Sequence, residues 1–541
     1  MKNDIDFMAD VDLNTPPEIV LRMLFAARCA VYKSDEEKLK IIEENAYLKD
    51  KLYGRSSEKS RRSKKPDDQI FDEAKASEAE LLADDAVLVT SEKLDAAVQS
   101  ADVESTKLPA KKRGRKPVPE HYVREDFIRD LSDDDKICAC GCKMKNIGED
   151  VTEQLELIPA KIYVKRFKRQ KYACKKCQEG VKTAPVQTQA IAKCLAAPGL
   201  LSHVAVMKFD DHLPLYRQAE IWDRLGADIS KSTLSSWVLK MGKNLDPLVQ
   251  HMQKHIVKSG YVQADETPVQ VLKTPGKKNT SHSYMWTYKT GDSENSAVVY
   301  EYQETRHGAF AKDFLKGFKG VLQTDGYKGY HCVTNKDSVK SMGCWAHARR
   351  KFFDIHKRVK KEGVASYAVT VIKKLYDIER EIKDLSPLEK HEIRQEKSKP
   401  ILDAFHIWLL EIKPNVQPKG MLDKAVQYTL NQWNSLIYYV KDGAVNIDNN
   451  AAERHIRPFA IGRKNWMFMG SPDGAKAGAV LYSLIESAKL NGVNPEGYLK
   501  FVLEHSIDAD DKKLLEKLMP WNVKISDDYP KPCQQIEADT S

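Results

Sequence analysis

The spacing of apolar residues changes character along the chain, and each change marks a different kind of predicted structure. Residues 36–52 place Ile41 and Leu48 at d positions of a heptad frame and the polar Asn45 at an a position. This pattern predicts one zipper-like helix, because a polar a residue sets the register of paired helices. The stretch is shorter than three heptads, so a surface helix packed on its own chain remains an alternative. Gly54 ends the pattern.

A second apolar pattern, from Leu195 to about Met252, has helical spacing throughout. Within it, Gly226 separates two amphipathic runs, and Ser230 or Ser232 follows as a natural cap of the second one. The pattern predicts a helix-turn-helix whose second helix presents Lys231 to a DNA groove. An ordinary helical hairpin is the alternative.

Beyond residue 260, short apolar runs alternate with turn residues, which predicts an α/β domain. Helix-like stretches follow the predicted strands. The predicted strands are 261–264 with 269–272, 283–289, 296–303 and 320–324.

Charge adds a DNA-binding arm to this picture. The net charge of the 541 residues is +9, but basic and acidic residues are segregated. Residues 66–105 are strongly acidic and predict a disordered linker. Residues 111–117 are basic around a glycine and look like the AT-hook type of minor-groove binder, with a solvated linker as the alternative. The expected contacts of this arm are Arg113, Arg115 and Lys116.

Cysteine spacing predicts a small zinc module. Two close groups of cysteines stand about 30 residues apart, and zinc favours four such ligands in tetrahedral array. The expected ligands are Cys174 and Cys177 with two of Cys138, Cys140 and Cys142. Between the groups, residues 161–172 mix basic and aromatic residues, which suits a ribbon facing phosphates. A purely structural zinc site is the alternative.

Three acids carry the candidate chemistry. Asp265 follows the first predicted strand, Asp325 follows the strand at 320–324, and Glu453 lies near the start of a predicted helix. A few carboxylates can hold two hard divalent cations, which activate the attacking and leaving oxygens of a phosphodiester. Each acid also has a structural reading: the aspartates as turn residues, and Glu453 as part of a capping box.

The helix that carries Glu453 has recognisable end signals. Asn449 or Asn450 is a natural N-cap, and Pro458 is expected to limit its length. Basic residues around this acid and further upstream are expected to contact DNA phosphates. They are Arg349, Arg350, Arg454, Arg457, Arg463 and Lys464.

Two further residues have competing readings. Cys344 and His347 stand three apart, but no further ligand is obvious, so a packed cysteine and a core or phosphate-facing histidine are expected. Trp433 is expected to be a core aromatic, with stacking on a distorted DNA end as the alternative.

Several of these motifs together resemble the insertion-sequence 66 type of bacterial transposase, over roughly residues 18–525. The motifs lie at 261–268, 323–327, 343–352, 449–458 and 461–466. The resemblance implies a catalytic domain of the ribonuclease H type with an Asp-Asp-Glu triad, which falls on Asp265, Asp325 and Glu453. The long interval between the last two acids leaves room for a mostly helical insertion at about 346–440. The first cysteine group departs from the family's usual Cys-x-x-Cys, which leaves its two zinc ligands open.

The expected protein is therefore a multidomain, cytoplasmic DNA transposase associated with the bacterial nucleoid. It would use Mg²⁺ or Mn²⁺ for cutting and strand transfer and Zn²⁺ for folding its small module. Double-stranded DNA is the expected partner, with a homo-oligomer on DNA and small accessory proteins as further expectations. A ribonuclease H-like nuclease without strand transfer and a zinc-containing regulator with an inactive triad are the alternatives.

The expected domain order follows these motifs. A zipper-like region and a charged linker with the basic arm precede the zinc module, the helix-turn-helix region, an α/β ribonuclease H-like domain with its helical insertion, and a C-terminal helical tail. Their expected bounds are 1–54, 55–117, 118–190, 191–255, 256–490 and 491–541.

Overall fold

The computed structural model describes residues 126, 162–173, 181–184, 190–291, 295–335, 337–359, 363–505 and 507–525. The zipper-like helix, the acidic linker, the basic arm with Arg113, Arg115 and Lys116, and the cysteines 138, 140, 142, 174 and 177 lie outside these residues. The chain divides into two units, one of which spans residues 85–168; of that unit, the described residues 162–168 are exposed and irregular.

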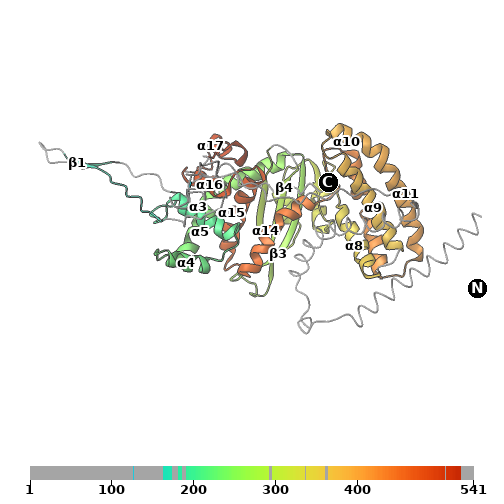
Figure 1. Ribbon diagram of the computed structural model, residues 1–541, viewed down its shortest axis with the longest axis horizontal. Helices are drawn as coiled ribbons and strands as arrows, with labels where there is room; N and C mark the ends of the chain where they lie inside the picture. Colours follow the sequence, from blue (N-terminus) through green and yellow to red (C-terminus); the bar gives the residue numbers. More distant parts are fainter. Residues whose placement is uncertain are drawn as a thin grey trace, which may run out of the picture. The chain divides into compact units, whose positions relative to one another are not determined.

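The helical region expected at 191–255 consists of three helices after a short antiparallel hairpin (Figure 1). Ser230 caps the third of them, because its side-chain oxygen accepts a hydrogen bond from the Thr233 N–H at 3.2 Å. Gly226 has a φ of +79° and forms the turn before it, as predicted. The elements are β1 (Lys171–Ala173), β2 (Val181–Thr183), α3 (Pro198–Phe209), α4 (Leu215–Arg224) and α5 (Lys231–Lys258).

A five-stranded mixed sheet follows, in the order β5-β4-β3-β6-β7. The first three strands in sequence pair antiparallel, whereas β6 runs parallel to β3 and β7 parallel to β6. The strands are β3 (Tyr261–Gln270), β4 (His282–Thr290), β5 (Val298–Gln303), β6 (Gly320–Gln323) and β7 (Val339–Met342). Short helices α6 (Ala309–Phe314), η3 (Lys328–Tyr330) and α7 (His331–Thr334) connect the later strands.

Strand β3 corrects the sequence analysis, which divided it at residue 264. It runs unbroken through Pro268, which pairs with Tyr284 of β4. The other neighbour, β6, pairs only with Tyr261–Gln263, so one edge of β3 lacks a strand partner around Pro268. A proline is tolerated at such an edge because it needs no ladder donor there.

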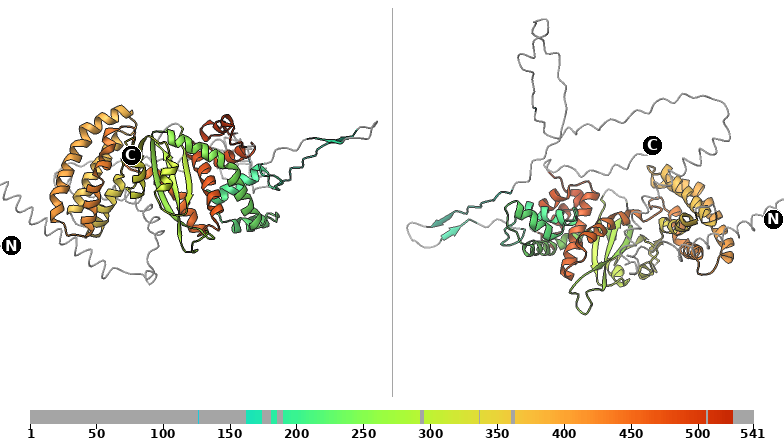
Figure 2. Two further views of the ribbon diagram at one scale, coloured as in Figure 1. Left: turned by 180° about the vertical axis from the view of Figure 1, so that it is seen from behind. Right: turned by 60° about the horizontal axis from the view of Figure 1, so that its bottom comes forward.

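Helices α14 (Asn450–Trp466) and α15 (Pro472–Leu490) lie along the sheet (Figure 2). Two serines of α15 support the outer strand β5: Ser487 Oγ accepts from the Val298 N–H at 3.0 Å, and Ser483 Oγ from the Tyr300 N–H at 2.8 Å. These bonds satisfy backbone donors of the edge strand. The remaining C-terminal elements are α16 (Pro495–Leu503), α17 (Lys512–Lys517) and η7 (Pro520–Asn522).

The stretch predicted as a helical insertion is helical, and its buried residues, among them Trp345, Phe405 and Leu436, form one core cluster with residues of the sheet such as Val321. Trp433 is 8% exposed and stacks on His406 with ring centroids 4.4 Å apart, so it is a core aromatic as expected. Its elements are α8 (Trp345–Val359), α9 (Val364–Glu381), α10 (Pro387–Ile393), η4 (Arg394–Ser398), α11 (Lys399–Ile412), η5 (Lys413–Asn415), α12 (Met421–Asn431), α13 (Trp433–Leu436) and η6 (Ile437–Lys441).

Within the described ranges, every helix is too short or too polar to span a lipid bilayer.

Candidate active site

Asp265 lies in the middle of β3, opposite Thr287 of β4, and not at the strand end that the sequence suggested. The strand continues past Asp265 through Pro268, because the edge of β3 there has no strand partner that needs a backbone donor. One of its carboxylate oxygens accepts the Glu266 N–H at 2.9 Å. Because β6 ends at Gln323, no strand pairs with β3 beside Asp265 on that side. The carboxylate therefore lies where the sheet opens.

Asp325 comes two residues after β6, in a turn that its own side chain stabilises. Its Oδ1 accepts the Tyr327 N–H at 2.8 Å, and Gly326 between them has a φ of +87°. A Cβ at Gly326 would also lie 3.0 Å from the Gln432 side chain. The backbone conformation and the close contact therefore both favour glycine at this position. The Tyr428 hydroxyl of α12 donates to the Asp325 carbonyl at 2.8 Å. The helical insertion thus holds the loop that carries the second acid.

Glu453 lies in the first turn of α14, and Asn449 is its N-cap residue, one of the two predicted. The Asn449 side chain makes no cap bond; its Nδ2 donates instead to the carbonyl of Ala264 at 3.1 Å. That bond ties the start of α14 to the residue before Asp265. Pro458 does not limit the helix, which continues to Trp466 because Ile456 and Phe459 are buried against the core.

A buried pair of glutamines connects β3 and β6 with the two ends of the helical insertion. Gln263 of β3 donates to the Gln323 Oε1 of β6 at 2.8 Å, and both side chains are fully buried. Gln323 in turn donates to the carbonyls of Gly343 at 3.1 Å and Asn446 at 3.0 Å, near the two ends of the insertion. Since unpaired buried amides are costly, this network fixes the strand ends relative to the insertion.

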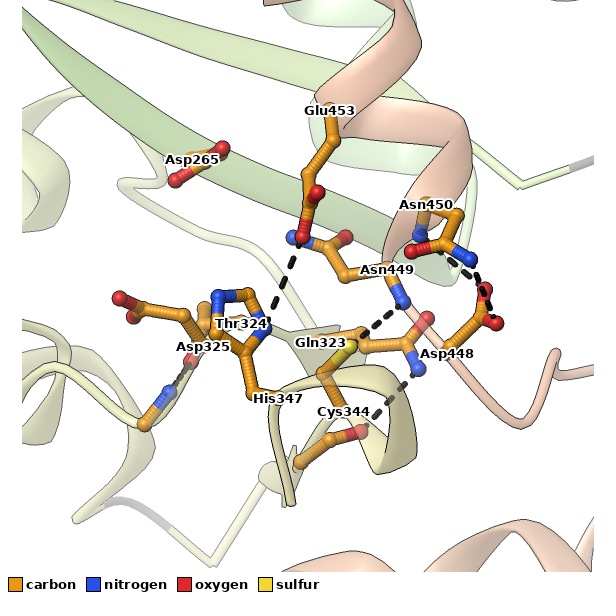
Figure 3. Close-up of polar contacts among 12 residues, drawn as sticks. Asp265, Gln323, Thr324, Asp325, Cys344, His347, Asp448, Asn449, Asn450 and Glu453 are labelled. Atoms are coloured by element: carbon orange, nitrogen blue, oxygen red, sulfur yellow. Dashed lines mark hydrogen bonds and ion pairs between the residues drawn. The ribbon is translucent and has the colours of Figure 1, made fainter. Parts of the chain in front are cut away.

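The three acids act on one another electrostatically. The pKa of Asp265 is raised well above its usual range, first by burial and then by the negative charges of Glu266, Asp325 and Glu453. Figure 3 shows Asp265, Asp325 and Glu453 pointing into the same space from β3, from the loop after β6 and from α14. Like charges this close favour a cation between them or a proton on one of them.

Glu266, a fourth acid next to Asp265, already has partners. Its carboxylate accepts the Arg306 Nε–H at 2.7 Å and the Tyr330 hydroxyl at 2.5 Å. Burial raises the pKa of Glu266, while the Arg306 charge opposes that rise. The same guanidinium lies 4.0 Å from the Asp325 Oδ2 and stacks over the Tyr327 ring. Sequence reasoning missed Arg306 because no motif marks it.

His347 is a second residue whose place the sequence did not reveal. Its Nδ1 lies 3.6 Å from the Glu453 Oε1 (Figure 3). Cys344 is fully buried, as expected, and its sulfur accepts the Asn449 N–H at 3.2 Å. The spacing of Cys344 and His347 was the available signal in the sequence. Glu453, which lies beside them in the fold, stands on α14, far along the chain.

Four of the expected DNA contacts keep exposed or partly exposed side chains. Arg454 and Lys464 on α14 are exposed, and Arg350 and Arg457 are partly so. Lys231, the first residue of α5, is also exposed.

Two others do not fit that expectation. Arg463 is only 4% exposed and donates to the Thr267 Oγ1 at 3.1 Å and to the Pro268 carbonyl, so it holds α14 against β3. Arg349 is 8% exposed, with its guanidinium 5.0 Å from the centre of the Phe353 ring. Clustered charge in the sequence did not reveal which of these side chains the fold buries.

Comparison with known proteins decides the family. The sequence profile of the Transposase IS66 family matches residues 193–477, which include the whole sheet and all three acids. The chain belongs to the IS66 transposase family. Profiles of the zinc-finger binding domain of transposase IS66, of the IS66 C-terminal element and of the Transposase C of IS166 homeodomain match further segments. They cover residues 135–178, 483–521 and 41–126.

Relatives in Sinorhizobium fredii share most of this IS66-family chain. The uncharacterized protein y4jD is 34% identical over 75% of the chain and 81% of its own length. The uncharacterized protein y4hP is 32% identical over 88% of the chain and 87% of its own length. Family membership confirms the resemblance seen in the sequence. It makes DNA the partner and supports Zn²⁺ in the zinc-finger segment, as predicted.

Proposed function

We propose that this chain cuts and joins DNA through a metal site made by Asp265, Asp325 and Glu453. The observation that carries the proposal is that three carboxylates from separate segments point into one space, where burial and the neighbouring negative charges raise the pKa of Asp265. We further propose that the mixed sheet, with the first acid on its central strand, is of the ribonuclease H type.

The donor set suits magnesium or manganese. All three groups offer carboxylate oxygens, which hard divalent cations prefer. The Glu453 Oε1 is buried and has no hydrogen-bond partner within the described ranges, so it is available to a ligand. Arg306, the cation beside Asp325, is already engaged by Glu266. Negative charge at the site is therefore compensated only in part by the residues that face it.

When bound, two such ions would supply activation of the attacking oxygen and stabilisation of the departing 3′ oxygen. The chain's own residues position the reaction. β3 and the Asp325 turn hold two carboxylates rigidly, and α14 brings the third through the bond from Asn449 to β3. Exposed Arg454 and Lys464 are placed to neutralise phosphate charge.

The same centre can serve both steps of transposition. Hydrolysis at the element's end frees a 3′ hydroxyl, and that hydroxyl can then attack target DNA, so no covalent enzyme intermediate is needed. A homo-oligomer on DNA and accessory proteins from the same element belong to this proposal. A nuclease without strand transfer and a regulator with an inactive triad are the competing functions.

Single substitutions with a labelled DNA end test the triad. We expect Asp265→Asn, Asp325→Asn and Glu453→Gln each to lower Mg²⁺-dependent cutting by about 100-fold or more, because each removes charge that the reaction needs. Binding to the DNA end should persist. Asp313→Asn, an exposed acid of α6, is the matched control and should cut normally.

The products separate the competing functions. Joined products with wild-type protein support a transposase, whereas cut ends that are never joined indicate a nuclease. A triad variant that still cuts at the wild-type rate removes that residue from the proposal.

A further inference from the structure

Cys344, His347 and Glu453 form a cluster that mixes ligand types beside the three acids. One donor atom from each lies within 4.8 Å of the other two. Cys344 is fully buried, but the side chains of His347 and Glu453 are 24% and 17% exposed. A cation would therefore meet His347 and Glu453 before the buried sulfur; all three side chains are drawn in Figure 3.

Two of the three donor atoms lack a hydrogen bond. His347 Nδ1 and Glu453 Oε1 are both buried, and neither has a hydrogen-bond partner in the part of the chain that the structure describes. They face each other at 3.6 Å. Buried polar atoms are nearly always bonded, so two such atoms aimed at one point indicate room for a ligand.

Two backbone donors contact the Cys344 sulfur, while burial raises the pKa of its thiol. Cys344 directly precedes α8, and backbone N–H groups of His347 and Asn449 donate to its sulfur, which favours the thiolate. Burial and the charges of Asp448 and Glu453 act in the other direction and raise the pKa of the thiol.

We propose that Cys344, His347 and Glu453 form a second metal site, selective for a thiophilic divalent cation of the Zn²⁺ or Cd²⁺ class. Sulfur and imidazole ligands favour these ions over magnesium. Donor atoms in a tetrahedral zinc site are roughly 3.4–3.6 Å apart given the usual bond lengths, so the three side chains must close by about 1 Å. On binding, the S–H bond breaks, a sulfur–metal bond forms and the proton passes to solvent.

Occupation of this site would inhibit the enzyme. Glu453 is the ligand common to both sites, and a soft cation held by Cys344 and His347 draws it away from Asp265 and Asp325. Zinc and magnesium therefore compete for one carboxylate. This part of the inference rests on the proposed function, whereas the binding site itself does not.

Cadmium binding by the full chain tests the site. Cadmium–thiolate bonds absorb in the ultraviolet, and the zinc-finger segment contributes equally in every variant. We expect wild type to bind one equivalent more than Cys344→Ala, and His347→Gln to bind the second equivalent about 100-fold more weakly or worse, because even outer-shell changes cost roughly 10–100-fold. Cys332→Ala removes another free cysteine and should match wild type.

Equal cadmium stoichiometry in wild type and Cys344→Ala, or an unchanged affinity of His347→Gln for the second equivalent, would overturn the site. His347→Gln keeps the test decisive if Cys344→Ala does not fold, because His347 is partly exposed.

Zinc inhibition tests the consequence. We expect micromolar Zn²⁺ to suppress Mg²⁺-dependent cutting by wild type, and the ratio of rates with and without zinc to approach one in Cys344→Ala. If zinc binds at the site and wild-type cutting is unchanged, the inhibitory role is wrong. If wild type never cuts, the proposed function fails, and the cadmium measurement still decides the site.

Discussion

Arg306 holds two acids of the candidate site at once. Its guanidinium bonds Glu266, which is buried beside Asp265, and lies 4.0 Å from Asp325. Without it, Glu266 would leave a buried charge unpaired and oppose ionisation of Asp265. The charge of Arg306 therefore affects how readily the neighbouring carboxylates ionise and bind a metal cation.

We expect Arg306→Gln to raise the Mg²⁺ concentration needed for half-maximal cutting by about tenfold, on the order of 1.4 kcal/mol. Arg306→Lys should recover part of the effect, because a point charge replaces only one bond of the guanidinium. Lys312→Gln, at an exposed position of α6, is the control. An unchanged magnesium requirement in Arg306→Gln would exclude this role.

Glu301 on β5 gives a pH test that is independent of metal. Burial raises its pKa to about 7, so the folded protein holds this proton more tightly than the unfolded chain does. The stability that it contributes is full below the unfolded pKa of about 4.5 and is lost as pH rises through about 7.

We therefore expect Glu301→Gln to match wild type at pH 5 and to be more stable at pH 8 by on the order of 2 kcal/mol. Thermal unfolding at both pH values measures it. Glu304→Gln, whose side chain is 50% exposed, should show no such gain. A gain for Glu301→Gln that is equal at pH 5 and pH 8 would contradict the assignment.

Single residues were predictable from sequence where a motif marked them. Asp265, Asp325 and Glu453 stand in distinctive local settings, and the fold places their charges within reach of one another. Arg306 stands in no motif, and its role depends on contacts with Glu266 across the fold. Arg463 was misjudged because sequence shows charge but not burial.

Among elements, α5 and α15 pack unusually closely at Gly242. A Cβ at Gly242 would lie 2.4 Å from the Ala477 Cβ and 2.5 Å from its Cα, which is backbone and cannot rotate away. This contact joins the helix that begins with Lys231 to the helix that supports β5.

We expect Gly242→Ala to destabilise the protein by about 1–3 kcal/mol, because the two helices must separate. The melting temperature should fall by roughly 2–4 °C for each kcal/mol. Gly199→Ala in α3 is the matched control, since its Cβ would meet only the Lys500 side chain at 4.0 Å. Equal melting temperatures for Gly242→Ala and wild type would show that the contact is loose.

The errors at this scale share a cause. Residues 265–268 were left out of the predicted strands and Pro458 was expected to limit a helix, yet β3 continues through Pro268 and α14 through Pro458. Local propensity penalises proline, but the unpaired edge of β3 removes the penalty and the buried face of α14 outweighs it. The extent of an element thus depended on its neighbours, which a single sequence does not show.

At the scale of the whole molecule, the order of the segments was predictable from sequence, but the contacts that bring them together were not. A helical insertion lies between Asp325 and Glu453, where the long interval between these acids left room for one. How Glu453 returns to the sheet after that insertion depends on contacts such as Asn449 with Ala264. Those contacts carry no signature in the sequence.

DNA binding by the exposed segment upstream of the catalytic domain gives a prediction for the whole chain. Lys165, Arg166 and Lys168 are all exposed. Replacing all three by serine should reduce the slope of log affinity against log salt by up to about 3, since each phosphate contact contributes roughly 0.9. Binding of a DNA end at several salt concentrations measures the slope. An unchanged slope would show that this segment does not contact phosphates.

The central claim is that three distant segments make one metal pocket, and iron cleavage tests it directly. Ferrous iron takes the place of magnesium in such pockets, and with peroxide and ascorbate it cuts the polypeptide beside the bound ion. We expect cuts near residues 265, 325 and 453 together, all suppressed by excess Mg²⁺ and all weakened in Asp265→Asn. Cuts that miss one of the three segments, or that persist unchanged in Asp265→Asn, would contradict the account.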